Sequence, residues 1–336
     1  MEKRLHSGFF PWHRPPEGGT GLLRYILKRL SAAIVSMFIV ITVVFLLMRL
    51  MPVEGYFGGR ADSMTEENKQ KILENMGLLD PWYKQLVNFY DDLIHLDFGR
   101  SVTLQPKTPV VKILAKKLPY SVYFGLGAIG ISLVLGCTLG ILMARRKGGF
   151  WDTLGTGYIV IINAVPPIVY YLMIQISVTA STPLPMLFNV SKPLSYILPL
   201  ICMALGPTAN YAMWIRRYMV DELNRDYIKL ARAKGMPNNA IMRRHVMRNA
   251  FIPLAQYLPS SILYTVSGSI YVEALFSIPG TGGLLINAIQ KQDNPLVQAL
   301  VLLYAVIGIG GLLLGDLAMA ICDPRIKLDK SKGGSR

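Results

Sequence analysis

Residues 221–254, with the sequence DELNRDYIKLARAKGMPNNAIMRRHVMRNAFIPL, are polar and basic, yet they lie between two long apolar runs. This stretch predicts two short helices with a break between them. Residues 227–234 are good helix formers, Gly235 suits a left-handed C-terminal cap, and Pro237 suits the first turn of the next helix. We call residues 221–254 the knuckle. A compact helical element between apolar runs is a candidate contact site for a partner protein.

The composition indicates a membrane protein. Of the 336 residues, 52% are hydrophobic and only 16% are charged, whereas soluble domains carry about 25% charged residues. The three cysteines, Cys137, Cys202 and Cys322, lie within or beside apolar runs and have neither disulfide nor metal-site spacing. The four histidines are scattered along the chain, which argues against a bundle-core metal or haem site.

Six uncharged runs predict transmembrane helices, each of which needs about 20 apolar residues. The first run has no cleavage site of the kind that follows a signal peptide. Pro166 and Pro167 predict a kink in the third run, and residues 179–189 predict its outer turn. The runs are residues 30–48, 118–144, the stretch after Asp152, 193–215, 249–272 and 294–315.

The segments around the first run predict three further features. Residues 1–20 are rich in glycine and proline and predict a mobile extension. Residues 21–29 are short, basic and amphipathic, and predict an interfacial helix. Residues 52–117 predict a small folded segment that either contacts an external partner or packs on the helix ends.

Residues 52–117 contain the signals of two helices. A capping box at residues 63–66 starts the first helix, and Gly77 ends it. Asp80 and Pro81 start the second helix. Its apolar residues recur at helical spacing, and they are Trp82, Leu86, Phe89, Leu93 and Leu96.

The distribution of charge orients the chain. With six spans, the side that holds both termini and the knuckle carries 23 basic and 8 acidic residues, whereas the other side carries 12 and 11. The positive-inside rule therefore predicts that the N- and C-termini are cytosolic. Because this topology accounts for the net charge of +15, the basicity is no sign of nucleic-acid binding.

The sequence carries no signature of catalysis or ATP binding. It contains no phosphate-binding loop, no HExxH zinc motif and no Cys–His–carboxylate cluster. An ion-driven carrier usually buries several ionisable groups in its spans, but Asp316 is the clearest candidate here. These observations favour a pore powered by another subunit over a self-contained channel or ion-driven carrier.

Several motifs resemble one family of permeases. Residues 226–235 (DYIKLARAKG) and 244–253 (RHVMRNAFIP) resemble the cytoplasmic loop of permease subunits of binding-protein-dependent ABC importers of the dipeptide, oligopeptide and nickel type. Residues 272–282 (VEALFSIPGTG) and 294–299 resemble the segment between that family's fifth and sixth helices. Residues 316–326 (DLAMAICDPRI) resemble its C-terminal signature.

Residues 23–30 and 97–101 resemble the first permease of the pair, and the whole resemblance covers roughly residues 22–328. It implies an all-α membrane protein with six transmembrane helices in the type I permease fold of ABC importers, and a small extracytoplasmic helical segment between helices 1 and 2. The chain departs from the family's usual pattern at residues 52–55, and the extension before Gly21 has no counterpart.

The resemblance also divides the chain into regions and places it in the bacterial cytoplasmic (inner) membrane. The cytosolic extension 1–20 and the interfacial helix 21–29 precede a transmembrane permease domain, and a cytosolic tail follows it. The domain comprises residues 30–328, with the extracytoplasmic segment 52–117 and a cytosolic coupling loop at 216–250, and the tail comprises residues 329–336.

The implied function is uptake of dipeptides or oligopeptides through a path formed with a second, homologous permease in the lipid bilayer. Two cytosolic ATPase subunits would bind ATP and Mg²⁺, and an extracytoplasmic binding protein would deliver the substrate. This chain would then be no enzyme and would hold no cofactor, metal or nucleic acid. Because relatives also carry nickel or metal chelates, such a substrate is the alternative.

The resemblance assigns ATPase contact to the knuckle, whose helix around residues 232–240 would sit in a cleft on one ATPase. The competing interpretation is that this basic loop only enforces topology. The expected coupling residues are Tyr227, Ala231, Arg232, Ala233, Lys234, Gly235, Met236, Pro237 and Ala240.

Two further sites are expected in the spans or at their ends. A turn at the outer end of the fifth span would either gate the substrate mouth or serve as a rigid turn, and the two interpretations are equally supported. Asp316 would pair with an arginine of the knuckle or face the path. The mouth residues are Glu273, Phe276, Pro279, Gly280 and Gly282.

Overall fold

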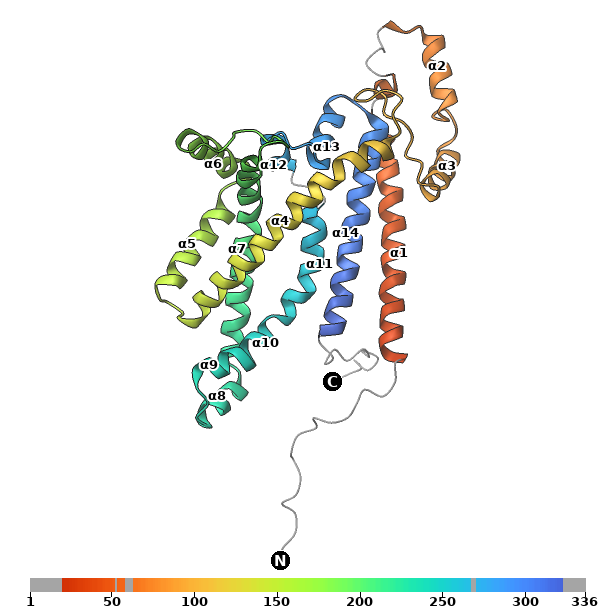
Figure 1. Ribbon diagram of the computed structural model, residues 1–336. Helices are drawn as coiled ribbons and strands as arrows, with labels where there is room; N and C mark the ends of the chain where they lie inside the picture. The colour runs from red at the N-terminus through yellow and green to blue at the C-terminus, as the bar shows by residue number, and fades with distance from the viewer. Residues whose placement is uncertain (1–19, 52, 58–62, 267–269, 323–336) are drawn as a thin grey trace, which may run out of the picture.

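Residues 20–51, 53–57, 63–266 and 270–322 are described by the computed structural model of the protein, and most of them are helical (Figure 1). Within these ranges the only β contact is an isolated bridge between Arg100 and Pro109. The helices before the knuckle are α1 (Thr20–Met48), η1 (Val53–Tyr56), α2 (Glu66–Asn75), α3 (Trp82–Ile94), α4 (Val110–Arg145), α5 (Phe150–Ala164), α6 (Pro167–Ser181), η3 (Pro193–Tyr196) and α7 (Ile197–Leu223). The knuckle and the segments after it form α8 (Asp226–Ala233), α9 (Asn238–Ile241), η4 (Met242–Val246), α10 (Met247–Ala250), α11 (Ile252–Val266), α12 (Ile270–Leu275), α13 (Thr281–Gln290) and α14 (Asn294–Cys322).

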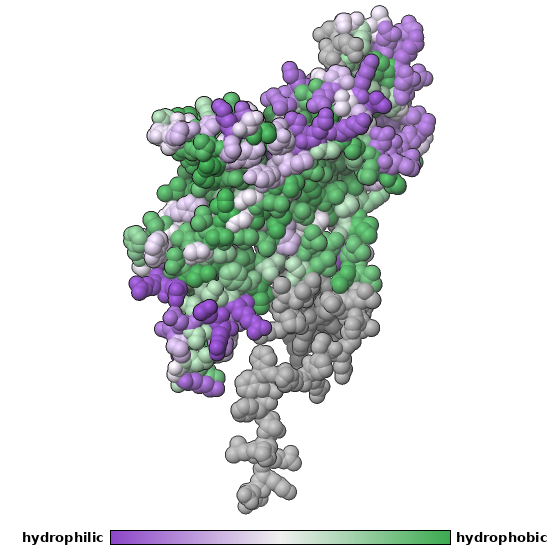
Figure 2. Space-filling view, in the orientation of Figure 1, coloured by the Kyte–Doolittle hydropathy of each residue, from purple (hydrophilic) through white to green (hydrophobic). Residues whose placement is uncertain are grey.

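The molecule has an apolar middle and two polar ends. α8 to α10 lie at the end where α1 begins and α14 finishes, and α2, α3, α12 and α13 lie at the opposite end (Figure 1). Figure 2 shows an apolar surface band between hydrophilic surfaces at the two ends. This arrangement fits a chain that crosses a bilayer several times.

Four helices are long and apolar enough to span a membrane: Ile26–Met48, Val110–Arg145, Pro193–Leu223 and Asn294–Ala318. The pair α5 and α6 becomes a fifth candidate if the two helices count as one span. The fifth run expected from the sequence, 249–272, contains the 15-residue α11 and then residues 267–269, which lie outside the described residues. Within the described ranges, four or five candidate spans are therefore present rather than six.

The predicted kink in the third span is confirmed. α5 and α6 are bent by 109° across a short break. Val165 and Pro166 are extended, with ψ of 131° and 133°, and Pro167 begins α6. Because proline lacks an amide hydrogen and forces the preceding residue out of the helical region, α5 cannot continue through this sequence.

α4 and α7 approach each other closely at two glycines. A Cβ atom on Gly136 would lie 2.8 Å from the Thr208 carbonyl oxygen, and one on Gly140 would lie 2.7 Å from the Ala212 carbonyl oxygen. No real side chain tolerates such contacts without movement of the backbone. The glycines of α4 therefore permit the backbones to pack closely, as small residues commonly do between membrane helices.

Hydroxyl groups from neighbouring helices bond to α7 around Pro207, which lies inside that helix. Ser132 donates to the Ala204 carbonyl at 2.9 Å, and Tyr158 donates to the Leu205 carbonyl at 2.7 Å. A proline inside a membrane helix leaves nearby carbonyls poorly bonded, and such hydroxyls satisfy them. α4 and α5 are thereby attached to α7 at mid-span.

The N-terminal boundaries differ from the expected ones. Residues 21–29, expected as a separate interfacial helix, are continuous with the first span in α1. The helix does not break there because residues 20–48 contain no proline and no glycine after Gly21. The extension 1–20, apart from Thr20, and the tail 329–336 lie outside the described residues.

The two helices expected within residues 52–117 are present as α2 and α3. Gly77 has φ +67°, which confirms its predicted role at the end of α2. The capping box is wrong in register, because Thr65 rather than Ser63 is the N-cap residue and its side chain makes no cap hydrogen bond. Leu96, expected in the second helix, lies beyond the end of α3 with φ +54°.

We predict that Gly140→Ala lowers the stability of the protein by about 1–3 kcal/mol, the usual cost of overpacking. The added methyl group would press on the backbone of α7. The matched control is Gly130→Ala in the same helix, because nothing lies within 4 Å of its added Cβ. Thermal unfolding in lipid nanodiscs measures the difference, and equal melting temperatures for the two variants would contradict the packing described above.

Candidate functional site

The first helix of the knuckle ends in a Schellman motif. The amide of Gly235 donates to the Arg232 carbonyl at 2.9 Å, and the amide of Met236 donates to the Ala231 carbonyl at 3.2 Å. Gly235 has φ +76°, a conformation that side-chain-bearing residues rarely adopt. The helix, break and helix predicted from the sequence are confirmed.

The single helix expected around residues 232–240 is wrong. α8 ends at Ala233, the chain turns through residues 234–237, and α9 begins at Asn238. The left-handed Gly235 and the missing amide hydrogen of Pro237 prevent one helix from continuing through this segment. The exposed part of the knuckle is therefore a helix–turn–helix tip.

The inner side of the knuckle packs on the end of α7. Its apolar side chains recur at helical spacing and form one cluster with the buried α7 residues Ile215 and Met219. Because α7 continues from a membrane span into this cluster, the knuckle is a folded extension of that span. The buried knuckle residues are Ile228, Ala231, Ile241, Val246, Ala250 and Leu254.

The expected coupling residues divide between the tip and the packed side. Those exposed at the surface are Tyr227, Arg232, Ala233, Lys234, Gly235 and Pro237. Ala231 is buried, and Met236 and Ala240 are half-buried, so these three support the tip from beneath.

Leu230 is an exposed apolar residue that sequence reasoning missed. It is 52% exposed and lies three residues after Tyr227, on the same face of α8. Ile228 and Ala231 are three residues apart and face α7. This spacing could have indicated that Leu230, between them, faces outward. The tip thus combines apolar and basic side chains.

Polar contacts fix the knuckle from two sides. The Glu222 carboxylate accepts hydrogen bonds from the Tyr227 hydroxyl and, at 2.8 Å, from the Asn249 amide. Partial burial and the bond to Glu222 raise the pKa of Tyr227 above its ordinary value. On the other side, Arg145 at the end of α4 donates to Asn239 at 2.8 Å.

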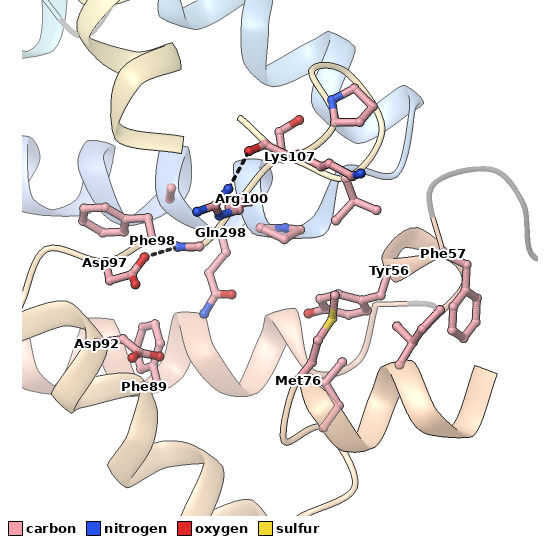
Figure 3. A pocket seen from close by; sticks show the side chains of 18 of the residues that line it. Tyr56, Phe57, Met76, Phe89, Asp92, Asp97, Phe98, Arg100, Lys107 and Gln298 are labelled. Atoms are coloured by element: carbon pink, nitrogen blue, oxygen red, sulfur yellow. Dashed lines mark hydrogen bonds between the residues drawn. The ribbon is translucent and has the colours of Figure 1, made fainter. Parts of the chain in front are cut away.

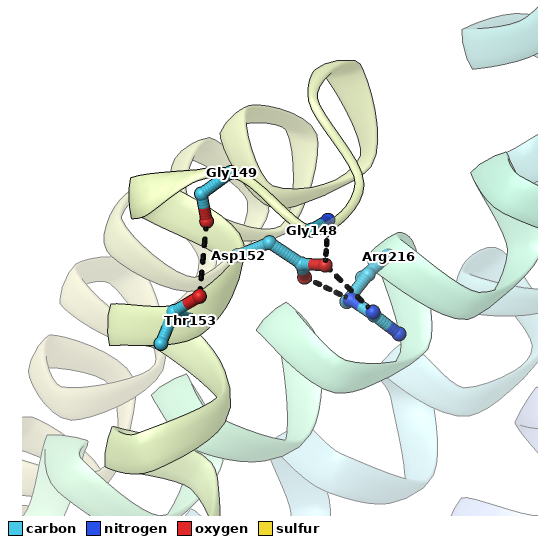
Figure 4. Close-up of polar contacts among 5 residues, drawn as sticks. All are labelled: Gly148, Gly149, Asp152, Thr153 and Arg216. Atoms are coloured by element: carbon cyan, nitrogen blue, oxygen red, sulfur yellow. Dashed lines mark hydrogen bonds and ion pairs between the residues drawn. The ribbon is translucent and has the colours of Figure 1, made fainter.

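A buried ion pair joins α5 to α7 at the knuckle end of the bundle (Figure 4). The carboxylate of Asp152 contacts the Arg216 guanidinium through both of its oxygens, and the second contact measures 2.9 Å. The same carboxylate accepts from the Gly148 amide at 2.8 Å. This bidentate pair, which the sequence did not predict, fixes the short loop between α4 and α5.

The expected mouth residues form a buried turn at the opposite end. The Glu273 side chain folds back, accepting hydrogen bonds from Ser121 at 2.7 Å and from the amides of Gly282 and Gly283 at 2.7 and 3.1 Å. The carboxylate therefore caps the N-terminus of α13 and attaches it to α4.

Glycine is required on both sides of this carboxylate. A Cβ atom on Gly280 would lie 2.3 Å from a Glu273 oxygen, and one on Gly282 would lie 3.0 Å from the backbone of Ile270. Phe276 is fully buried, and Pro279 is half-buried. The geometry is that of a tightly held turn.

A second carboxylate anchors the loop that precedes α4. Asp293, just before α14, is fully buried and accepts hydrogen bonds from the Ser101 hydroxyl and from three backbone amides of residues 102–104, at 2.9–3.2 Å. This loop borders a hollow of about 620 Å³ between α3 and α14, into which Asp92 and Gln298 project (Figure 3). Partial burial and the nearby Asp97 raise the pKa of Asp92.

Asp316 does not contact the knuckle. Its carboxylate lies 3.0 Å from the guanidinium of Arg29 in α1, so the expected pairing with an arginine of the knuckle is wrong. The reason is that α14 runs beside α1, and its end lies away from α8 and α9 (Figure 1). The pair joins α1 to α14.

No constellation for catalysis or metal binding is evident in the described ranges. No group of three or more His, Cys, Asp or Glu side chains among those residues is arranged to hold a metal ion. The buried carboxylates Asp152, Glu273 and Asp293 are all engaged by hydrogen-bond donors of the chain itself. The tip of the knuckle, in contrast, presents exposed polar, basic and apolar side chains.

Comparison with known proteins places these features in context. Residues 136–328 match the family described as "Binding-protein-dependent transport system inner membrane component". Residues 22–124 match the family that describes the N-terminal part of the membrane component of such transport systems. The "Dipeptide transport system permease protein DppB" of Bacillus subtilis is 32% identical over 310 residues, which cover 92% of this chain and 99% of the relative.

Two oligopeptide permeases are also similar. The "Oligopeptide transport system permease protein OppB" of Salmonella typhimurium is 29% identical over 308 residues, covering 91% of this chain and all of the relative. The "Oligopeptide transport system permease protein AmiC" of Streptococcus pneumoniae is 37% identical over 213 residues, covering 62% of this chain and 42% of the relative.

We predict that Gly280→Ala destabilises the turn before α13 by about 1–3 kcal/mol, because the new methyl group would displace the Glu273 carboxylate. Gly283→Ala is the matched control, since its added Cβ would make only ordinary contacts at 3.7 Å or more. Thermal unfolding and the yield of purified protein measure both variants. If Gly283→Ala were as harmful as Gly280→Ala, the capping role of Glu273 would be refuted.

Proposed function

The chain belongs to the family of binding-protein-dependent transport system inner membrane components, and we propose that ATPase subunits of the complex drive it by contact with the knuckle. The protein is a permease subunit of an ABC-type peptide importer. Its family consists of membrane transport subunits rather than enzymes. The energy for uptake then comes from other subunits of the complex.

The proposed complex contains four further subunits. A second, homologous permease completes the translocation path, and an extracytoplasmic binding protein delivers the substrate. Two cytosolic ATPase subunits bind ATP and Mg²⁺, so that this chain needs no cofactor of its own. The absence of a phosphate-binding loop from the sequence supports this division of labour.

One observation carries the coupling proposal: the tip of the knuckle is exposed while its base is buried against α7. A cleft on one ATPase receives the helix–turn–helix tip, with Tyr227 and Leu230 as apolar contacts and Gly235 at the turn. Closure of the ATPases then moves α7 together with the tip. The positive charge of the knuckle is needed only for topology.

The proposed topology has six spans in the bacterial inner membrane, with both termini and the knuckle in the cytosol. The strong charge asymmetry between the two ends supports it. α11 and α12, which flank residues 267–269, together make up the remaining span. The segment with α2 and α3 is then extracytoplasmic, and the tightly held turn at Glu273 shapes the outer end of the bundle rather than gating it.

Dipeptides or oligopeptides are the proposed substrates, because the relatives named above are dipeptide and oligopeptide permeases. The alternative within the family type is a nickel or metal-chelate substrate. The alternative from another class, a self-contained ion-driven carrier, requires free ionisable groups in the spans. The buried carboxylates described above are instead bonded within the chain, which disfavours it.

We predict that Gly235→Trp in the assembled complex lowers substrate-stimulated ATP hydrolysis and uptake by about tenfold or more, which corresponds to about 1.4 kcal/mol of lost contact. The space around a Gly235 Cβ is open within the chain, so the large side chain would obstruct the partner rather than the knuckle. Hydrolysis and peptide uptake are measured together in proteoliposomes.

Two controls separate obstruction from backbone strain. Gly148→Trp places the same side chain at another exposed glycine, with φ +79° and no atom within 4 Å of its added Cβ. Gly235→Asn introduces a small side chain, and asparagine tolerates positive φ. If Gly235→Trp retained normal hydrolysis and uptake, the coupling role would be disproved.

A further inference from the structure

α3 has a wide apolar face and a narrower polar face. Around the helix, two adjacent apolar rows are flanked by polar residues, which is the pattern of a helix that lies at a membrane surface. The first apolar row is Leu86, Phe89 and Leu93, the second is Tyr83, Val87, Tyr90 and Ile94, and the polar row beside the second is Lys84, Asn88, Asp91 and His95. Gln85 and Asp92 complete the polar face on the other side of the first apolar row.

Phe89, Leu93 and Tyr90 pack on α1. The ring of Phe89 stacks on Phe45 with centroids 5.1 Å apart, and the ring of Tyr90 stacks on Phe38 at 5.2 Å. The Tyr90 hydroxyl also lies 2.7 Å from the hydroxyl of Thr42. α3 is therefore fixed along a defined part of α1.

That part of α1 lies within its membrane span. The span runs to Met48, and a helix rises about 1.5 Å per residue, so Phe45 lies about 5 Å and Phe38 about 15 Å inside its end. The outer half of a bilayer's hydrocarbon core is about 15 Å deep. The contacts of α3 on α1 thus fall within the length of the apolar span rather than beyond its end.

Apart from Tyr90, the second apolar row is uncovered within the chain. Tyr83, Val87 and Ile94 are 60%, 66% and 77% exposed. Phe38 and Ile39 of α1 are also exposed, at 56% and 54%, so the row continues an apolar surface of a span. The polar row carries exposed charges, including an ion pair of Lys84 with Asp80 at 3.0 Å.

We propose that α3 is an interfacial helix whose row of Tyr83, Val87 and Ile94 is covered by acyl chains of the adjoining leaflet, while its polar row faces headgroups and water. The depth of its contacts on α1 selects lipid as the occupant. The segment 52–117, expected as a cap above the membrane, then sits partly in it. This inference does not depend on the coupling role of the knuckle.

Site-directed spin labelling in the assembled complex tests the proposal. Single cysteines are introduced as Val87→Cys and Asn88→Cys, and again as Ile94→Cys and His95→Cys, after Cys137, Cys202 and Cys322 are replaced by serine. Each pair compares the apolar row with the adjacent residue of the polar row. Collision with oxygen, which concentrates in lipid, and with a water-soluble nickel chelate is measured in nanodiscs.

The proposal predicts a several-fold higher ratio of oxygen to nickel accessibility at Val87 and Ile94 than at Asn88 and His95. High nickel accessibility in both rows would mean that α3 stands in water, and the proposal would be wrong. Low accessibility to both reagents at Val87 and Ile94 would mean that protein, such as the second permease, covers the row, which would equally overturn it. The agreement of the two independent pairs guards against a local disturbance by one label.

Discussion

The close contact between α4 and α7 is the constraint on which the rest of the structure depends. At Gly136 and Gly140 the two helices approach until no Cβ atom fits between them. Hydroxyls of Ser132 and Tyr158 bond to carbonyls of α7 near Pro207, where the helix lacks an amide donor. Because α7 continues into the knuckle and its end forms the knuckle's apolar base, one continuously packed unit extends from the opposite end of the bundle to the exposed tip.

The buried carboxylates have structural tasks at the ends of helices. Glu273 caps α13, Asp293 holds the loop before α4, and Asp152 fixes the loop between α4 and α5 through Arg216. Each is satisfied by donors from the chain, so none is free to bind and release an ion during transport. The fixed turns at both ends of the bundle thus hold neighbouring helices in place.

Local features of the fold were predictable from the sequence, whereas contacts between distant segments were not. Uncharged runs identified the four candidate spans and the bent pair of α5 and α6. Gly235, Gly77 and Pro166–Pro167 marked a turn, a helix end and a bend that the structure contains. The partner of Asp316 was wrong, because composition does not reveal that α14 lies beside Arg29 of α1. Tertiary packing also determines the hydrogen bond between Ser121 and Glu273, which are 152 residues apart, and the packing of α3 on α1.

The most direct test of the central claim, that the knuckle and α7 move as one body, is a distance measured by pulsed electron paramagnetic resonance. One label replaces Asn238 at the knuckle tip and the other replaces Lys192 just before the outer end of α7, both exposed positions. The full complex is compared without nucleotide and trapped with ATP and vanadate. A rigid unit predicts the same distance distribution in both states, and a shift or broadening of several ångströms on trapping would contradict it.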